Sequence, residues 1–103
     1  MTEQAYVSAI RDLYLQLPKA SSRFTRADRE LAKDLHHRGI PVVTVRSALL
    51  LATARRVCRN PASPPLPPVR SLHYFVPAID EVLLKPLPHG YCEYLESKVA
   101  EHH

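Results

Sequence analysis

Basic side chains gather in two short stretches of this sequence, and their types and spacing suit the binding of phosphate groups. The first stretch enters a predicted helix, where steps of three or four residues place side chains on one face. The second closes a long apolar segment. A guanidinium group is a planar fork that matches two phosphate oxygens. The candidate phosphate contacts are Arg23, Arg26, Arg29 and Lys33 in the first stretch, and Arg46, Arg55, Arg56 and Arg59 in or after the apolar segment.

The distribution of charge along the chain indicates the same chemistry. The sequence has 14 Lys and Arg against 10 Asp and Glu, which gives a net charge of +4, and most of the bases are arginine. Residues 1–60 carry 11 bases and 5 acids, whereas residues 61–103 carry 3 bases and 5 acids. Such an asymmetry is typical of a chain whose basic part meets a polyanion. The composition therefore favours nucleic-acid contact through the first 60 residues.

Side chains that could perform catalysis or hold a metal ion are scarce. Asp80 and Glu81 are adjacent, so on a helix they point to different faces and form a poor acid–base pair. His36 and His37 are also consecutive. Because neighbouring helical positions diverge by about 100°, we expect two helix-end or surface histidines that do not share a metal ion. The sequence predicts a protein that is not an enzyme and has neither a cofactor nor a metal site.

Cysteine and glycine usage excludes further classes of site. Cys58 and Cys92 lack a CxxC or Cys/His spacing, so we expect two thiols in a reducing compartment rather than structural zinc. Two glycines are too few for a Gly-rich phosphate loop. No apolar leader follows Met1, and no apolar run approaches 18 residues, so we expect a cytoplasmic protein without membrane contact. His102 and His103 fit either native residues or the start of a purification tag and are excluded as ligands.

The periodicity of apolar residues predicts an all-α fold that positions these side chains. With 103 residues, 46% of them hydrophobic, the chain is expected to form one helical domain over residues 1–103, a compact bundle of about five helices. The first helix is predicted over residues 2–17, with Thr2 as its N-cap and Pro18 as its stop. The third is predicted over residues 41–59. Because that segment is apolar on nearly every side, we expect it at the centre.

The second helix carries the first basic stretch. Thr25 followed by Asp28 has the spacing of a capping arrangement, and Gly39 suits the position just after a helix end. The predicted inner stripe consists of Ala27, Leu31 and Leu35. The basic side chains are therefore expected on the outer side.

A proline-rich loop separates the third and fourth helices. Residues 60–68 are expected to be extended and stiff, a brace packed over the bundle. Pro65, Pro68 and Arg70 also fit a PxxPxR pattern that suits an SH3 groove, but the connector interpretation is favoured because short proline patterns are weak signals.

The last two helices follow this loop. Ser71 is predicted to cap the fourth, and Pro77 is predicted to kink it or to move its regular part to begin near residue 76. The fifth carries a stripe that is more apolar than a terminal helix needs unless it docks on something. This stripe, a candidate surface for a protein partner or for self-association, consists of Tyr91, Tyr94, Leu95 and Val99.

Four segments, in order, carry a family resemblance: residues 28–32 (DRELA), 38–41 (RGIP), 45–52 (VRSALLLA) and 70–75 (RSLHYF). Their order resembles the C-terminal domain of DnaD-like primosomal proteins and related replication initiators of plasmids and mobile elements, over residues 10–84. The resemblance implies an all-helical module that binds DNA and helps to load or recruit a replicative helicase. It also implies a DNA contact at Tyr74, which stands where the family has the tyrosine of a Tyr, Ile, Trp motif.

Two hypotheses of different classes follow. The first is a DNA-associated module of replication or mobile-element machinery that binds the phosphate backbone through an Arg-rich face. The second is a subunit for protein interaction or oligomerisation, without direct nucleic-acid contact, whose basic residues are only solvated. The first requires the arginines of the leading three helices to converge into one patch instead of each meeting a carboxylate.

Overall fold

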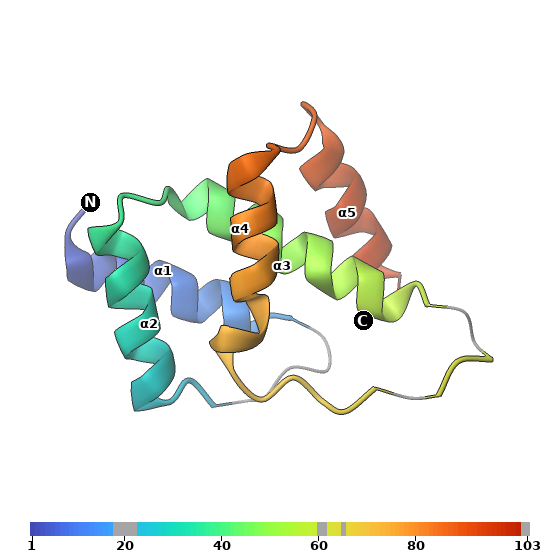
Figure 1. The fold of residues 1–103 in the computed structure, drawn as a ribbon, viewed down its shortest axis with the longest axis horizontal. Helices are drawn as coiled ribbons and strands as arrows, with labels where there is room; N and C mark the ends of the chain where they lie inside the picture. Colours follow the sequence, from blue (N-terminus) through green and yellow to red (C-terminus); the bar gives the residue numbers. More distant parts are fainter. Residues whose placement is uncertain (18–22, 60–61, 65, 102–103) are drawn as a thin grey trace.

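The fold is known from a computed structural model that describes residues 1–17, 23–59, 62–64 and 66–101. Over these residues the chain forms five α-helices and one short 3₁₀-helix (Figure 1). The predicted all-α bundle is confirmed, and no helix in this part of the chain is long and apolar enough to cross a membrane. The elements are α1 (Glu3–Leu15), α2 (Arg26–His37), α3 (Val42–Val57), η1 (Leu72–Phe75), α4 (Val76–Leu84) and α5 (Tyr91–Ala100).

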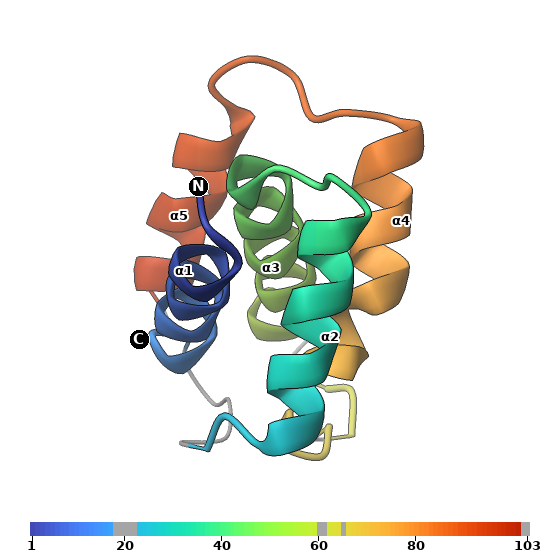
Figure 2. The ribbon, with the colours of Figure 1, turned by 90° about the vertical axis from the view of Figure 1, so that its left-hand side faces the viewer.

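Helix α3 lies at the centre of the bundle, as its apolar sequence predicts. Figure 2 shows α1 and α5 on one side of α3 and α4 on the other, with α2 beside α1. Val45, Ala48 and Leu49 of α3 are at most 1% exposed. Full burial of an aliphatic side chain of Val or Leu size contributes about 1.5–3 kcal/mol. This helix is therefore the apolar spine on which the others pack.

The ends of α1 and α2 follow their predicted caps. The Thr2 hydroxyl accepts a hydrogen bond from the Ala5 N–H at 3.1 Å, which begins α1. Helix α1 ends at Leu15, and its predicted stop, Pro18, lies outside the described residues. After α2, Gly39 has a φ of 73°, a conformation that glycine adopts without strain.

The start of the fourth helical segment is also confirmed, with a refinement. The Ser71 hydroxyl accepts a hydrogen bond from the His73 N–H at 3.1 Å and caps the 3₁₀-turn η1. The regular helix α4 begins only at Val76, so Pro77 lies in its first turn. A proline there loses no intrahelical hydrogen bond, so the regular helix can begin at this point, as the second of the two predicted alternatives has it.

A buried carboxylate organises the beginning of α2. Asp28 is 0% exposed. Its Oδ2 accepts from the Thr25 N–H at 2.9 Å, and the Thr25 hydroxyl accepts from the Asp28 N–H at 3.2 Å, which is the predicted capping box. Its Oδ1 accepts from the Ser71 hydroxyl at 3.0 Å and from the Leu72 N–H at 2.9 Å. One side chain thus caps α2 and ties it to η1.

The inner face of α2 differs from the predicted stripe. Ala27 is exposed, whereas Ala32 and Leu35 are buried together with Asp28. Leu35 is buried and Leu31 packs against the core as predicted, so the prediction is wrong only at Ala27. Asp28 was missed because the prediction treats an acidic residue as outward-facing, which holds for most unpaired carboxylates. Here the hydrogen bonds to Oδ1 satisfy the acid, so its side of the helix can face the core.

The surroundings of Asp28 determine its protonation. Burial raises its pKa, and the hydrogen bonds from Thr25, Leu72 and Ser71 lower it by more, so the pKa lies below its ordinary value. A carboxylate with a depressed pKa in the folded state stabilises the protein above its unfolded-state pKa of about 3.9. That stabilisation is lost as the pH falls through the folded-state pKa.

We expect Asp28→Asn to lower the free energy of unfolding by about 2 kcal/mol at neutral pH, because an amide cannot accept all of the bonds that the carboxylate accepts. The loss should shrink on acidification, because the wild type then loses its own ionised carboxylate. Urea unfolding at about pH 7 and about pH 3 measures both effects. The control is Asp34→Asn, an exposed acid on the same helix. Equal losses in the two variants would contradict this role for Asp28.

Candidate nucleic-acid interface

Two of the predicted phosphate contacts are engaged by carboxylates of neighbouring helices. Arg55 donates from its two terminal nitrogens to both carboxylate oxygens of Glu81, at 2.8 and 2.6 Å, and so joins α3 to α4. The hydrogen bonds from Arg55 lower the pKa of Glu81 below its ordinary value. Arg46 forms an ion pair with Glu96 and joins α3 to α5. Both guanidinium groups already have a carboxylate partner, which lowers the positive charge that they offer to a phosphate.

Lys33 also has an acidic neighbour, but the contact is weaker. Its Nζ lies 3.4 Å from a carboxylate oxygen of Glu30, one turn earlier in α2, and both side chains are well exposed. An exposed pair of this kind contributes about 0.3–0.5 kcal/mol. Lys33 therefore remains at the margin of a basic surface, whereas Arg46 and Arg55 do not belong to it.

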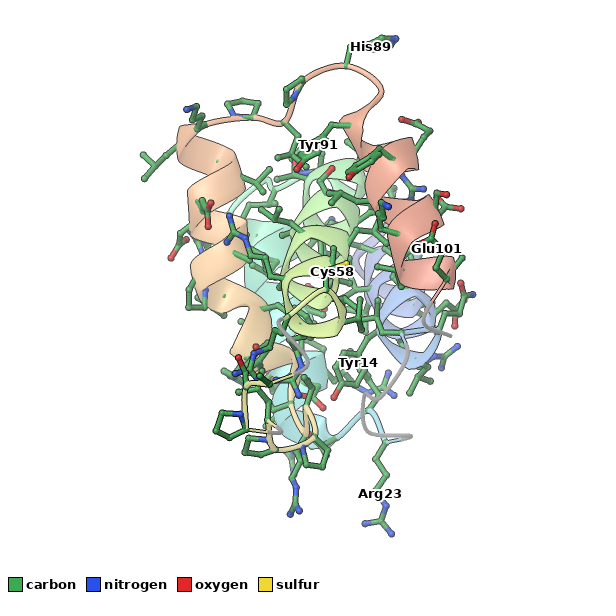
Figure 3. The ribbon with its side chains drawn as sticks, turned by 90° about the vertical axis from the view of Figure 1, so that its right-hand side faces the viewer. Tyr14, Arg23, Cys58, His89, Tyr91 and Glu101 are labelled. Carbon is green, nitrogen blue, oxygen red and sulfur yellow. The ribbon has the colours of Figure 1, made fainter. Side chains whose placement is uncertain are left out.

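The remaining predicted phosphate contacts, together with Arg70, lie on segments along one edge of the bundle. Figure 1 shows the chain leaving the end of α3, running along the lower side of the molecule and returning beside the start of α2. Figure 3 shows Arg23 pointing outward from this end, away from the helices and at the opposite end from His89. We name the basic residues of these segments the arginine edge: Arg23, Arg26 and Arg29 before and within the start of α2, Arg56 and Arg59 at the end of α3, and Arg70 before η1.

Two members of the edge also hold the proline-rich loop in place. Arg56 donates to the Pro67 carbonyl at 2.5 Å, and Arg59 donates to the Pro64 carbonyl at 2.8 Å. The second terminal nitrogen of Arg56 donates to the Tyr74 hydroxyl at 3.2 Å. Because carbonyl and hydroxyl oxygens are uncharged, these bonds fix the guanidinium groups without neutralising them. The predicted brace is thus tied to the end of α3, although its first residues, 60–61, and Pro65 lie outside the described residues.

Two aromatic rings lie beneath arginines of the edge. The Cζ atom of Arg56 is 5.2 Å from the centroid of the Tyr74 ring, and that of Arg29 is 6.0 Å from the centroid of the Phe24 ring. A cation–π contact orients the guanidinium plane and leaves its N–H donors at the rim. Tyr74 is 45% exposed, so its neighbours cover this residue only in part.

Arg70 is the edge residue that the sequence did not assign to the site. In the sequence it belongs to the PxxPxR pattern, far from the basic residues of α2. The hydrogen bonds from Ser71 and Leu72 to Asp28 place it next to the start of that helix. The sequence feature that could have revealed this neighbourhood is Asp28. An acid on the inward-facing side of a helix requires hydrogen-bond donors from another segment of the chain.

The apolar stripe of α5 is largely used within the chain. Leu95 is 3% exposed and Val99 is 6% exposed, and both belong to the hydrophobic core. Tyr91 stacks on Tyr94 with ring centroids 5.6 Å apart and an interplanar angle of 14°. Only Tyr94 of this stripe is well exposed, at 53%. The packing on α3 accounts for most of the stripe without a partner.

The histidines at the end of α2 depart from expectation. One ring nitrogen of His36, one of His37 and a carboxylate oxygen of Glu3 all lie within 4.8 Å of one another. The two rings therefore do not diverge as predicted, whereas the expectation that they do not share a metal ion stays a prediction. Although consecutive Cβ atoms diverge, imidazole side chains are long enough to turn back toward each other, and Glu3 arrives from α1.

Among the described residues, two sets of charged or imidazole side chains are not explained by packing of the core: the arginine edge, and the group of Glu3, His36 and His37. No protein-family model, no curated protein and no solved structure matches this chain. Functional conclusions therefore rest on the contacts of its own residues.

Replacing an arginine that is paired with a carboxylate and replacing one that is bonded to neutral oxygens should change the free energy of unfolding with different salt dependence. We expect Arg55→Gln to lower the free energy of unfolding at low ionic strength and to have little effect in about 1 M NaCl, because exposed ion pairs are screened. Arg56→Gln should cost about 1 kcal/mol at either salt concentration, since its partners are neutral acceptors. Urea unfolding of both variants at the two salt concentrations measures this. A salt-sensitive loss for Arg56→Gln would contradict the distinction.

Proposed function

We propose that this chain is a DNA-associated helical module of replication or mobile-element machinery, and that it binds the phosphate backbone through the arginine edge. One observation carries the proposal. Among the described residues, five arginines of the edge have no carboxylate within ion-pair distance, while Arg46 and Arg55 elsewhere are paired. The five are Arg26, Arg29, Arg56, Arg59 and Arg70.

The placement of acidic residues strengthens the positive character of this edge. Glu81 and Asp80 lie on α4 and Glu96 on α5, each beside a base that is not on the edge. The acid at the edge itself, Asp28, is buried and satisfied by hydrogen bonds. Glu30 is the exposed exception and already contacts Lys33. A surface with this separation of charge steers a polyanion toward itself.

The same geometry favours phosphate contact over base reading. The capping box of α2 already satisfies the Asp28 N–H, so this helix end has fewer N–H groups left for a phosphate. Helix α3 is buried and cannot enter a major groove. The donors that remain are guanidinium groups on flexible stems, which position a protein on nucleic acid without reading its sequence.

The resemblance to DnaD-like initiators supports the same class of function. Two of its four segments, residues 28–32 and 70–75, are the ones that Asp28 joins at the edge. In this proposal Tyr74 adds a partly exposed ring beside Arg56. An aromatic ring next to a guanidinium suits the stacking of an unpaired base.

The test compares two variants that remove the same charge from different surfaces. The edge variant is Arg26→Gln, Arg29→Gln and Arg70→Gln, and the matched control is Arg11→Gln, Arg38→Gln and Lys85→Gln. Fluorescence anisotropy measures binding to labelled single-stranded and duplex DNA between about 50 and 200 mM salt. For a duplex, we expect the edge variant to lose about 2.7 from the slope of log K against log salt, at about 0.9 per phosphate.

The control variant should keep the wild-type slope and lose little affinity. Absence of wild-type binding to either DNA at low salt would reject the proposal. Equal losses in the two triple variants would also reject it, because they would indicate a response to net charge alone. Circular dichroism of both variants checks that the helices remain folded.

A further inference from the structure

The start of α1 and the end of α2 bring together three side chains of types that can bind a metal ion, at the end of α2 opposite Arg26 and Arg29. Glu3 lies in the first turn of α1, and His36 and His37 lie in the last turn of α2. One potential ligand atom from each lies within 4.8 Å of the others. The closest pair is His37 Nε2 and Glu3 Oε2, at 2.7 Å.

We propose that Glu3, His36 and His37 form a site for a divalent transition-metal ion, with Zn²⁺ as the reference ion. Two imidazoles and one carboxylate are ligands of the type that Zn²⁺ and its neighbours in the first transition row prefer. Three protein ligands leave at least one coordination position for water. The site is independent of the proposed DNA contact.

The distances are compatible with coordination after small movements of exposed side chains. With bonds of about 2.0–2.2 Å to nitrogen and oxygen, neighbouring ligands of a tetrahedral ion lie about 3.4 Å apart. The side chains of His37 and Glu3 are 69% and 42% exposed, so both have room to turn. The present contact between them would be replaced by two bonds to the ion.

His36 is the preorganised member of the group. Its ring packs against Tyr6, with centroids 5.1 Å apart, and Tyr6 is itself held by a hydrogen bond from its hydroxyl to the Ile40 carbonyl at 2.8 Å. The His36 Nδ1 atom is buried and has no hydrogen-bond partner among the described residues. Because the hydrogen bonds of this ring are incomplete, it loses little when one of its nitrogens turns to a metal ion.

Metal binding would connect α1 to α2 at the end opposite their contact with η1. An ion that binds only the folded chain stabilises it by mass action. We therefore expect Zn²⁺ to raise the melting temperature of the protein as well as to bind it saturably. The second readout does not depend on any activity.

The experiment uses the full chain without an added tag, with His102→Gln and His103→Gln in every protein so that these imidazoles cannot contribute. Isothermal titration measures Zn²⁺ binding, and Co²⁺ absorption reports the ligand set. The variants are Glu3→Gln, His36→Gln and His37→Gln, and the control is His89→Gln, an exposed histidine on the loop before α5 (Figure 3). We expect each variant to weaken Zn²⁺ binding by about tenfold or more, as loss of even an outer-shell partner does, and the control to bind as the parent does.

Thermal unfolding separates a metal site from a purely structural contact. If the group binds metal, Zn²⁺ raises the melting temperature of the parent and of His89→Gln but not that of the Glu3→Gln, His37→Gln double variant. If Glu3 and His37 only link two helices, the double variant melts lower without metal and no protein responds to Zn²⁺. The absence of saturable binding by the parent, or equal binding by the double variant, would overturn the proposal.

Discussion

A single carboxylate joins the two segments whose meeting creates the arginine edge. Asp28 caps α2 and accepts hydrogen bonds from Ser71 and Leu72 at the start of η1. Because a buried charge without partners is strongly destabilising, this arrangement holds only when all of its donors are in place. The beginning of α2 and the end of the proline-rich loop are thereby fixed side by side, and Arg70 joins the basic residues of α2. The same bonds keep the carboxylate ionised, so the contact keeps its full strength above the ordinary carboxyl pKa and weakens as the pH falls through the lowered pKa of Asp28.

The arginines of this protein perform two physical tasks, and their partners distinguish them. Arg46 and Arg55 meet Glu96 and Glu81 and fasten α5 and α4 to the central helix. Arg56 and Arg59 meet carbonyl oxygens of the loop and keep their charge. A guanidinium held by neutral acceptors is already positioned for an anion, which lowers the entropy lost when the anion binds. The structural brace and the proposed phosphate surface are therefore built from the same side chains.

Helix α2 separates two different chemistries at its two ends. Its first turn carries the basic residues and the buried acid, and its last turn carries the histidines that meet Glu3. Helix α1 packs along α2 and supplies both Glu3 and the Tyr6 ring that supports His36. Figure 2 shows α1 and α2 side by side in front of α3, so the spine supports both ends of α2; it contributes Arg56 to the arginine edge and no ligand to the histidine group. The proposed DNA contact and the proposed metal site can thus be tested and altered separately.

The sequence by itself determined the helices, their caps and the central place of α3. The helices and the central place of α3 depend on apolar spacing. The caps depend on side chains, such as those of Thr25 and Ser71, that reach backbone groups within about four residues, and on a glycine at a helix end, Gly39. Tertiary structure alone decided which charges are neutralised and which converge. Arg55 and Glu81 are 26 positions apart, Arg46 and Glu96 are 50 apart, and His37 and Glu3 are 34 apart. Such pairs form only after the helices have packed, because no local pattern records which faces of distant segments will meet.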